Sequence, residues 1–451
     1  MKTQLLAVGA AMVLLAGAAH GAPLADPPGS AAAASPQVPA FDAKAESDVI
    51  AAVAKLLTDN YIYPDTGKRA AALIGENLRT GAYKGLDRDA FAKRLTDDLR
   101  SVTHDKHMWV GAGGPPGASG PGQEPPPSLF GFERADRLKG NIGYVRLNGF
   151  MPREAFAIGA DQLMPKLAGT DALIIDMRDN HGGSPDAVSY FVSFFVAAGS
   201  PVHVNDLIWR KPGTEDYDRQ VFSTSATPVS YHGKPVFLVT GPETFSGGEE
   251  FSYDMQVLKL ATLVGETTGG GANPGGTQPV GAGLVMFLPS GRAENPITIT
   301  SWEGTGVKPD VATPTAQAFA TAYAAALKAA HQPVIAADTP DAVVTDPLLV
   351  LRTQPYPQGE AYIRRQVEGL VKGEQPFDIF SPGMAEALKG PVPQATQDTM
   401  KAQGALKRIA FVRVDPFGAD EYDVTFEKGE QIWTMAINGA GKIVFAFFRP
   451  K

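Results

Sequence analysis

The sequence predicts an α/β protein with a small helical unit before the core and a small α+β unit after it. The short stretches Ile142–Leu147, Ala172–Met177 and Val236–Thr240 are nearly continuous apolar runs, and each is followed by a turn and a helical pattern. Apolar strands that feed helices are typical of a sheet covered on both faces. Helical spacing dominates before this region, and strand patterns dominate the end of the chain.

The N-terminus has the features of a processing signal. Lys2 supplies a positive charge, and an apolar run follows from Leu5 to Ala19. The small residues Ala19 and Gly21 then stand at the spacing that a signal peptidase requires. We therefore predict a signal peptide over residues 1–21. The alternative, a membrane anchor, needs a longer apolar run.

A predicted signal peptide implies a secreted protein, in the bacterial periplasm, that does not span a membrane after cleavage. Residues 22–46 are rich in Ala, Pro and Ser and are predicted to form a disordered linker. Residues 47–110 are predicted to form an N-terminal helical subdomain, because apolar residues recur at helical spacing. Asp87 is the expected N-cap of its third helix.

The segment Gly111–Pro127 is dense in Gly and Pro and is predicted to be an exposed loop. We assign residues 128–330 to the α/β core and predict a linker over 332–355. A small α+β domain is expected over 355–451, where a helix precedes strand patterns. Its last two strands are expected to join at a turn around Asn438.

Composition excludes several classes of protein. The chain has 451 residues, no cysteine and a formal net charge of −8. Disulfide frameworks and thiolate chemistry are therefore excluded. An acidic chain without a basic block also argues against a nucleic acid partner.

The first candidate for chemistry is Ser246, in Thr244-Phe245-Ser246-Gly247-Gly248-Glu249. It follows a buried strand and opens a helix, where free backbone N–H groups can stabilise an oxyanion. The alternative is a serine that only caps the helix.

The second candidate is the turn Asp176–Gly183, which also joins a buried strand to a helix. Its paired glycines, Gly182 and Gly183, can present a second oxyanion donor. Alternatively, this turn is a tight structural loop in which Asp176 and Arg178 form an ion pair.

A serine nucleophile needs a base, and histidine is the usual one. His104 and His107 lie three residues apart, but no further ligand stands near enough for a three-ligand zinc site. We predict no metal and no cofactor.

Five motifs together resemble the S41 family of serine peptidases, which includes the C-terminal processing proteases, the tricorn core and the interphotoreceptor retinoid-binding protein modules. The motifs begin at Gly143, Asp176, Thr244, Gly265 and Gly304 and occur in the family's order. The resemblance implies a ClpP/crotonase-like core, and the helical segment is similar to the retinoid-binding-protein-like branch. The tail resembles, more weakly, an NTF2-like domain.

By this resemblance Ser246 is the nucleophile, His107 the base and Glu303 the carboxylate that orients the imidazole. Gly247, with either Gly183 or Gly182, corresponds to the oxyanion donors. The implied activity is hydrolysis of peptide or protein substrates through an acyl-enzyme.

The sequence also departs from the family. The stretch that carries a catalytic lysine in the processing proteases has none here, which disfavours a Ser–Lys dyad. Lys106 stands where tricorn has a serine, and no PDZ-like segment precedes the core. Two alternatives stay open: a non-catalytic protein that binds apolar ligands on the same scaffold, and an esterase.

Overall fold

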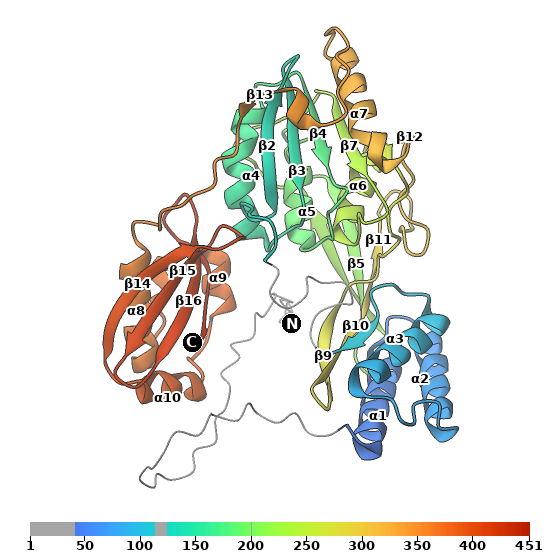
Figure 1. The fold of residues 1–451 in the computed structure, drawn as a ribbon, viewed down its shortest axis with the longest axis vertical. Coiled ribbons are helices and arrows are strands. Elements are labelled where there is room, and N and C mark those ends of the chain that lie inside the picture. Colours follow the sequence, from blue (N-terminus) through green and yellow to red (C-terminus); the bar gives the residue numbers. More distant parts are fainter. Residues whose placement is uncertain (1–40, 113–123, 200) are drawn as a thin grey trace.

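A computed structural model describes residues 41–112, 124–199 and 201–451 (Figure 1). The predicted signal peptide, most of the predicted linker 22–46 and much of the predicted loop 111–127 lie outside these residues. The chain enters the N-terminal unit at Asp42, which caps the first helix by accepting a hydrogen bond from Ala45 N. The helix therefore begins before the boundary at residue 47 that the sequence predicted. The helices of this unit are α1 (Ala43–Asn60), α2 (Pro64–Arg79) and α3 (Arg88–Thr103).

The core is built around one mixed sheet, visible in the upper half of Figure 1. Its strands, in order across the sheet, are β12 (Val311–Ala312), β8 (Thr262–Gly265), β7 (Val236–Thr240), β4 (Ala172–Asp176), β3 (Ile142–Leu147), β2 (Phe132–Leu138) and β13 (Val344–Pro347). The strands from β12 to β3 run parallel, while β2 and β13 pair antiparallel.

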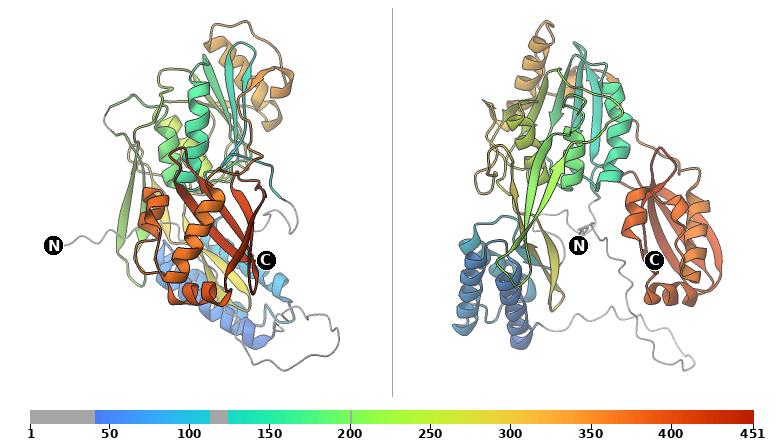
Figure 2. Two further views of the ribbon diagram at one scale, coloured as in Figure 1. Left: turned by 90° about the vertical axis from the view of Figure 1, so that its left-hand side faces the viewer. Right: turned by 180° about the vertical axis from the view of Figure 1, so that it is seen from behind.

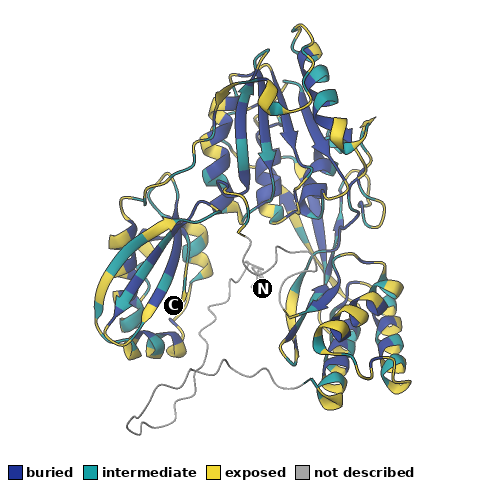
Figure 3. Cartoon of the chain, viewed as in Figure 1, coloured by how far each residue is buried: buried dark blue, intermediate teal, exposed yellow. Residues whose placement is uncertain are grey.

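Helices cover both faces of this sheet, as the apolar strands predicted. On one face, Leu173 and Leu238 pack against α4 (Arg153–Leu167), α5 (Pro185–Val192) and α6 (Gly247–Val257). On the other face, Ile174 and Val239 pack against α7 (Thr315–Ala329). Every residue of the central strands β4 and β7 is buried (Figure 3), so the middle of the sheet is a rigid support for the turns at its strand ends.

Two smaller sheets extend from the core, and the sequence analysis missed them. One has the order β11 (Gly291–Glu294), β5 (His203–Arg210), β6 (Tyr217–Ser223). The other has the order β1 (Trp109–Gly111), β10 (Leu284–Pro289), β9 (Gly275–Gly281).

The β1–β10–β9 sheet ties the helical unit to the core. Leu284 and Met286 of β10 are buried in the same apolar cluster as Leu57 of α1 and Leu95 of α3. Since β1 follows α3 directly and pairs with β10, the loop between α3 and β1 is anchored to this sheet.

The C-terminal unit has its own apolar cluster, which includes Ile363, Trp433 and Ile443. Its antiparallel strands are β14 (Leu406–Val414), β15 (Asp420–Phe426), β16 (Glu430–Ile437) and β17 (Ile443–Pro450). Its helices are α8 (Gly359–Lys372), η2 (Phe377–Ile379), α9 (Pro382–Ala387) and α10 (Gln394–Ala402), and η1 (Pro340–Ala342) precedes β13. The α+β character agrees with the prediction, whereas the NTF2-like topology stays a prediction.

This unit docks on the core through backbone and side-chain bonds. Phe130 N donates to Phe417 O at 2.8 Å, and Ser381 Oγ donates to Glu154 at 2.5 Å. It lies on the opposite side of the molecule from the helical unit (Figures 1 and 2). In the ranges that the structure describes, no helix is long and apolar enough to cross a bilayer.

Candidate active site

The turn after β7 presents Ser246 in an unusual backbone conformation. Ser246 has φ 54° and ψ −122°, which a residue other than glycine rarely adopts. The turn is fixed to its neighbour after β4, because Thr244 Oγ1 donates to Met177 O at 2.8 Å and Phe245 N donates to Asn180 O at 2.9 Å. Since α6 begins at Gly247, the serine stands at the N-terminus of a buried helix.

The turn after β4 lies directly against the serine. A side chain on Gly182 would place its Cβ 2.7 Å from Ser246 Cβ and 2.6 Å from Gly247 N, so only glycine fits there. Gly182 N already donates to Asn180 Oδ1 at 2.9 Å. Of the alternatives that the sequence left open, this bond favours Gly183 with Gly247 as the oxyanion donors.

The Arg178 guanidinium donates to both carboxylate oxygens of Asp176, at 2.9 and 2.6 Å. The predicted structural ion pair is therefore present in the same turn as the paired glycines.

Glu249 connects the nucleophile turn to the loop after β8. The buried carboxylate accepts hydrogen bonds from Ser246 N at 3.0 Å, Thr268 Oγ1 at 2.5 Å, Gly270 N at 2.6 Å and Gly271 N at 2.8 Å. One side chain thus connects the turn that carries Ser246 with the loop after β8, and these two segments flank the serine.

The His107 side chain reaches the turn that carries Ser246 from the loop between α3 and β1. Its ring lies 4.6 Å from the Phe245 ring, measured between centroids, and stacks on Phe287 of β10 at 5.9 Å. Lys106 Nζ donates to Gly269 O at 2.5 Å, which fastens the histidine loop to the loop after β8. Within the described residues neither ring nitrogen of His107 has a hydrogen-bond partner, so the nitrogen of the neutral ring that carries no proton is free to accept one.

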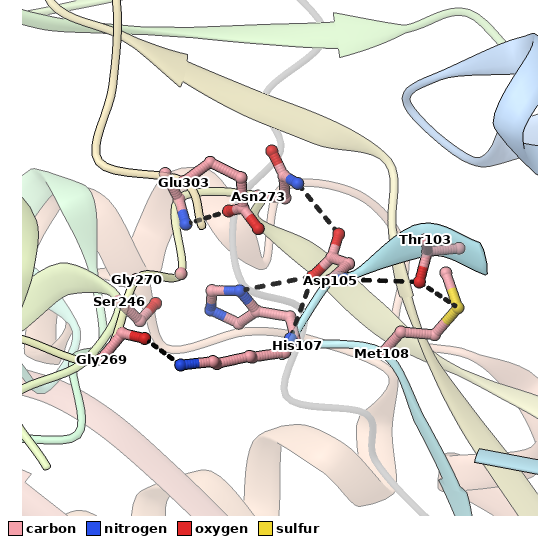
Figure 4. A network of polar contacts seen from close by, with 12 residues as sticks. Thr103, Asp105, His107, Met108, Ser246, Gly269, Gly270, Asn273 and Glu303 are labelled. Carbon is pink, nitrogen blue, oxygen red and sulfur yellow. Dashed lines mark hydrogen bonds and ion pairs between the residues drawn. The ribbon is translucent and has the colours of Figure 1, made fainter. Parts of the chain in front are cut away.

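Glu303 comes from the segment after β11. Its carboxylate accepts a hydrogen bond from Ala272 N at 2.5 Å. Figure 4 shows Ser246, His107 and Glu303 around one space, with the imidazole between Ser246 and Asp105. The structure therefore brings the predicted nucleophile, base and carboxylate together from distant segments of the chain.

In the described segments, no three His, Asp or Glu side chains are grouped in a way that could hold a metal ion.

Comparison with known proteins identifies two family domains. Residues 141–313 match peptidase family S41, and residues 31–129 match the N-terminal domain of peptidase S41 in eukaryotic IRBP. The chain belongs to peptidase family S41. This S41 protein is accordingly a serine-type peptidase, a hydrolase.

Solved structures similar to this S41 peptidase are remote in sequence. The photosystem II D1 C-terminal processing protease is 14% identical over 60% of this chain and 93% of its own, with a TM-score of 0.41. A lipoprotein from Streptococcus agalactiae is 12% identical over 60% and 92%, with a TM-score of 0.43. The tricorn protease is 12% identical over 60% and 34%, with a TM-score of 0.39.

Burial controls the ionisation of the S41 site. Desolvation, with repulsion from Arg100, lowers the pKa of His107 to about 4. Desolvation raises the pKa of Asp105 to about 6. Desolvation, with repulsion from Asp105, raises the pKa of Glu303 to about 8. The imidazole is therefore neutral at physiological pH, as a base must be.

We expect the His107 ring to titrate near pH 4 in the free enzyme, because burial penalises its charged form. Its ¹H–¹⁵N NMR signals, assigned with a His107→Gln variant, should therefore stay at their neutral positions from pH 8 down to about pH 5. The exposed His104 ring is the internal control. A His107 midpoint near the ordinary value of about 6.5 would contradict this prediction.

Several residues around the site were not assigned a role by the sequence analysis. Glu249 stands three residues after Ser246, which is the capping-box spacing and was an available signal. Asp105, Asn273 and Tyr61 come from three separate segments, and no sequence pattern connects them.

Proposed function

We propose that this protein hydrolyses peptide bonds through an acyl-enzyme on Ser246. The observation that supports this most directly is the meeting of a strained serine at a helix N-terminus with an imidazole whose ring nitrogens are buried and unpaired in the described structure (Figure 4). Such a pair is the minimum needed to generate a serine nucleophile at neutral pH.

In the proposed reaction, Ser246 Oγ attacks the peptide carbonyl carbon while His107 takes the hydroxyl proton. The C–N bond then breaks, and the imidazolium gives this proton to the leaving amine. Water, deprotonated by His107, attacks the resulting ester and releases the acid and the free Ser246 hydroxyl. The N–H groups of Gly183 and Gly247 stabilise the oxyanion formed in each half.

The resemblance assigns the orienting carboxylate to Glu303. This assignment stays a prediction, because the hydrogen bond that the Glu303 carboxylate accepts comes from Ala272 N rather than from the imidazole. No step in this mechanism needs a cofactor.

We further propose that the protein acts in the bacterial periplasm after loss of residues 1–21, with peptides or proteins as substrates. In the same proposal the core has a ClpP/crotonase-like fold, and the C-terminal unit, NTF2-like, serves as a spacer or ligand-binding module.

A fluorophosphonate probe tests the activity and the processing together. The purified mature enzyme is expected to gain one probe adduct, located by tryptic mass spectrometry on the peptide that holds Ser246. Its intact mass should show the loss of residues 1–21. Absence of labelling from pH 6 to pH 9 would favour the alternative of a non-catalytic binding protein. A panel of peptides and simple esters then separates a peptidase from an esterase.

A further inference from the structure

We infer that Asp105 is the positioning residue of His107: its buried carboxylate orients the imidazole and carries the negative charge that faces it during the reaction. This inference rests on the proposed function. It assigns to Asp105 the role that the resemblance gives to Glu303.

The position of Asp105 supports this role first. Asp105 Oδ1 lies 3.9 Å from His107 Nδ1, and among the described residues it is the carboxylate that comes within 4.0 Å of a ring nitrogen of His107. The same oxygen accepts His107 N at 3.0 Å. The carboxylate therefore holds the His107 backbone and lies on the side of the ring that carries Nδ1, which leaves Nε2 on the side that faces Ser246 (Figure 4).

The carboxylate is itself held rigidly. Asp105 is fully buried, and its Oδ2 accepts hydrogen bonds from Asn273 Nδ2 at 2.9 Å and from Tyr61 OH at 3.3 Å. Asn273 precedes β9 and Tyr61 follows α1, so three segments converge on one buried acid. A carboxylate that accepts several such bonds is stabilised in its charged form.

The charge state separates Asp105 from Glu303. Burial raises both pKa values, but to about 6 for Asp105 and to about 8 for Glu303. At pH 7 Asp105 is therefore mostly ionised, and Glu303, beside it, is mostly protonated. Only an ionised carboxylate can stabilise the imidazolium by its charge.

The distance of 3.9 Å is longer than a hydrogen bond. Catalytic hydrogen bonds are often long in free enzymes and shorten when the substrate binds. The charge that appears on His107 during the reaction attracts Asp105, and this attraction is strong because both groups are buried. Arg100 interacts electrostatically with both His107 and Asp105. The other ionisable groups around the pair are Tyr61, Tyr63 and Glu303, which interact with Asp105, and Lys106 and Glu249, which interact with Glu303.

The test compares Asp105→Asn with the matched variant Glu303→Gln. Each change removes a carboxylate with little change in shape. The rate of fluorophosphonate labelling is measured from pH 4 to pH 9 for both variants and for the wild type. Labelling needs no knowledge of the natural substrate.

In the wild type we expect the rate to fall as the pH drops through about 6, because protonation of Asp105 removes the charge that faces His107. Asp105→Asn should lower the plateau rate by about 10²- to 10⁴-fold. It should also move the acid limb of the pH–rate profile, the fall in rate at low pH, to about pH 4, where His107 itself becomes protonated. Glu303→Gln should keep the limb near pH 6 and lose less than about 10-fold in rate. A purely structural role for Asp105 would lower the plateau without moving the limb.

If circular dichroism shows that Asp105→Asn does not fold, the variant Tyr61→Phe provides a second test. It removes one donor to the charged carboxylate, so the pKa of Asp105 rises and the acid limb should move up by about 0.5 to 1 pH unit. An unmoved limb in Tyr61→Phe overturns the inference.

A wild-type rate in Asp105→Asn, together with a large loss in Glu303→Gln, also overturns the inference and leaves the proposed function intact. Absence of labelling in the wild type removes both.

Discussion

Replacing Ser246 with alanine is expected to lower kcat/KM for a peptide substrate by about 10⁵-fold and to abolish fluorophosphonate labelling. The hydroxyl is the group that forms the covalent bond, and no water held by His107 can reproduce its position. Stability should change little, because alanine and serine pay similar strain at φ 54°. Steady-state kinetics, labelling and thermal unfolding measure these three effects.

Ser252→Ala is the matched control for Ser246. Ser252 lies on the same helix, and its hydroxyl donates to Gly248 O at 2.8 Å. This variant should lose about 1 kcal/mol of stability and keep its activity within about 10-fold. Full labelling of Ser246→Ala would remove Ser246 from the mechanism.

Replacing Glu249 with alanine is expected to produce the largest loss of stability in the site, about 3 to 5 kcal/mol. The change leaves four donors without their acceptor: the N–H groups of Ser246, Gly270 and Gly271 and the Thr268 hydroxyl. Because these donors lie in the turn that carries Ser246 and in the loop after β8, the position of the nucleophile should change and kcat should fall as well. Chemical denaturation measures the free energy of unfolding.

Glu243→Ala is the control for this prediction, since Glu243 is an exposed carboxylate in the same turn. Its stability should stay within about 0.5 kcal/mol of the wild type. Equal stability losses in the two variants would show that the Glu249 hydrogen bonds do not stabilise the fold.

The parts of the fold that could be predicted are those whose information is local. The strand Ala172–Asp176 is apolar up to its last residue, and helix α3 has both a capping aspartate and an apolar stripe. Strand β9 was missed because Gly275–Gly281 contains glycines and Pro279, which usually indicate a loop. It forms a strand because β10 pairs with it, and that pairing is not local.

The active site shows the same difference between what local sequence predicts and what depends on the topology. Ser246 could be identified from its strand–turn–helix position, and His107 and Glu303 only through a family resemblance. The orienting role that we infer for Asp105 depends on Asn273 and Tyr61, which the topology brings together. No pattern within one segment predicts such a meeting.

The attachment of the helical unit through β1 and the β9–β10 hairpin has a consequence for how this enzyme fails. His107 directly precedes Met108, which is buried in the apolar cluster of the helices, whereas Ser246 directly precedes α6, whose Phe251 is buried in the cluster of the large sheet. Proteins open in cooperative parts before they unfold globally. A partial opening at this seam would separate the two halves of the catalytic machinery while the sheet stays intact. The lifetime of the activity therefore depends on the weaker of two sets of contacts, those that hold the helical unit to the core and those within the large sheet. It does not depend on global unfolding.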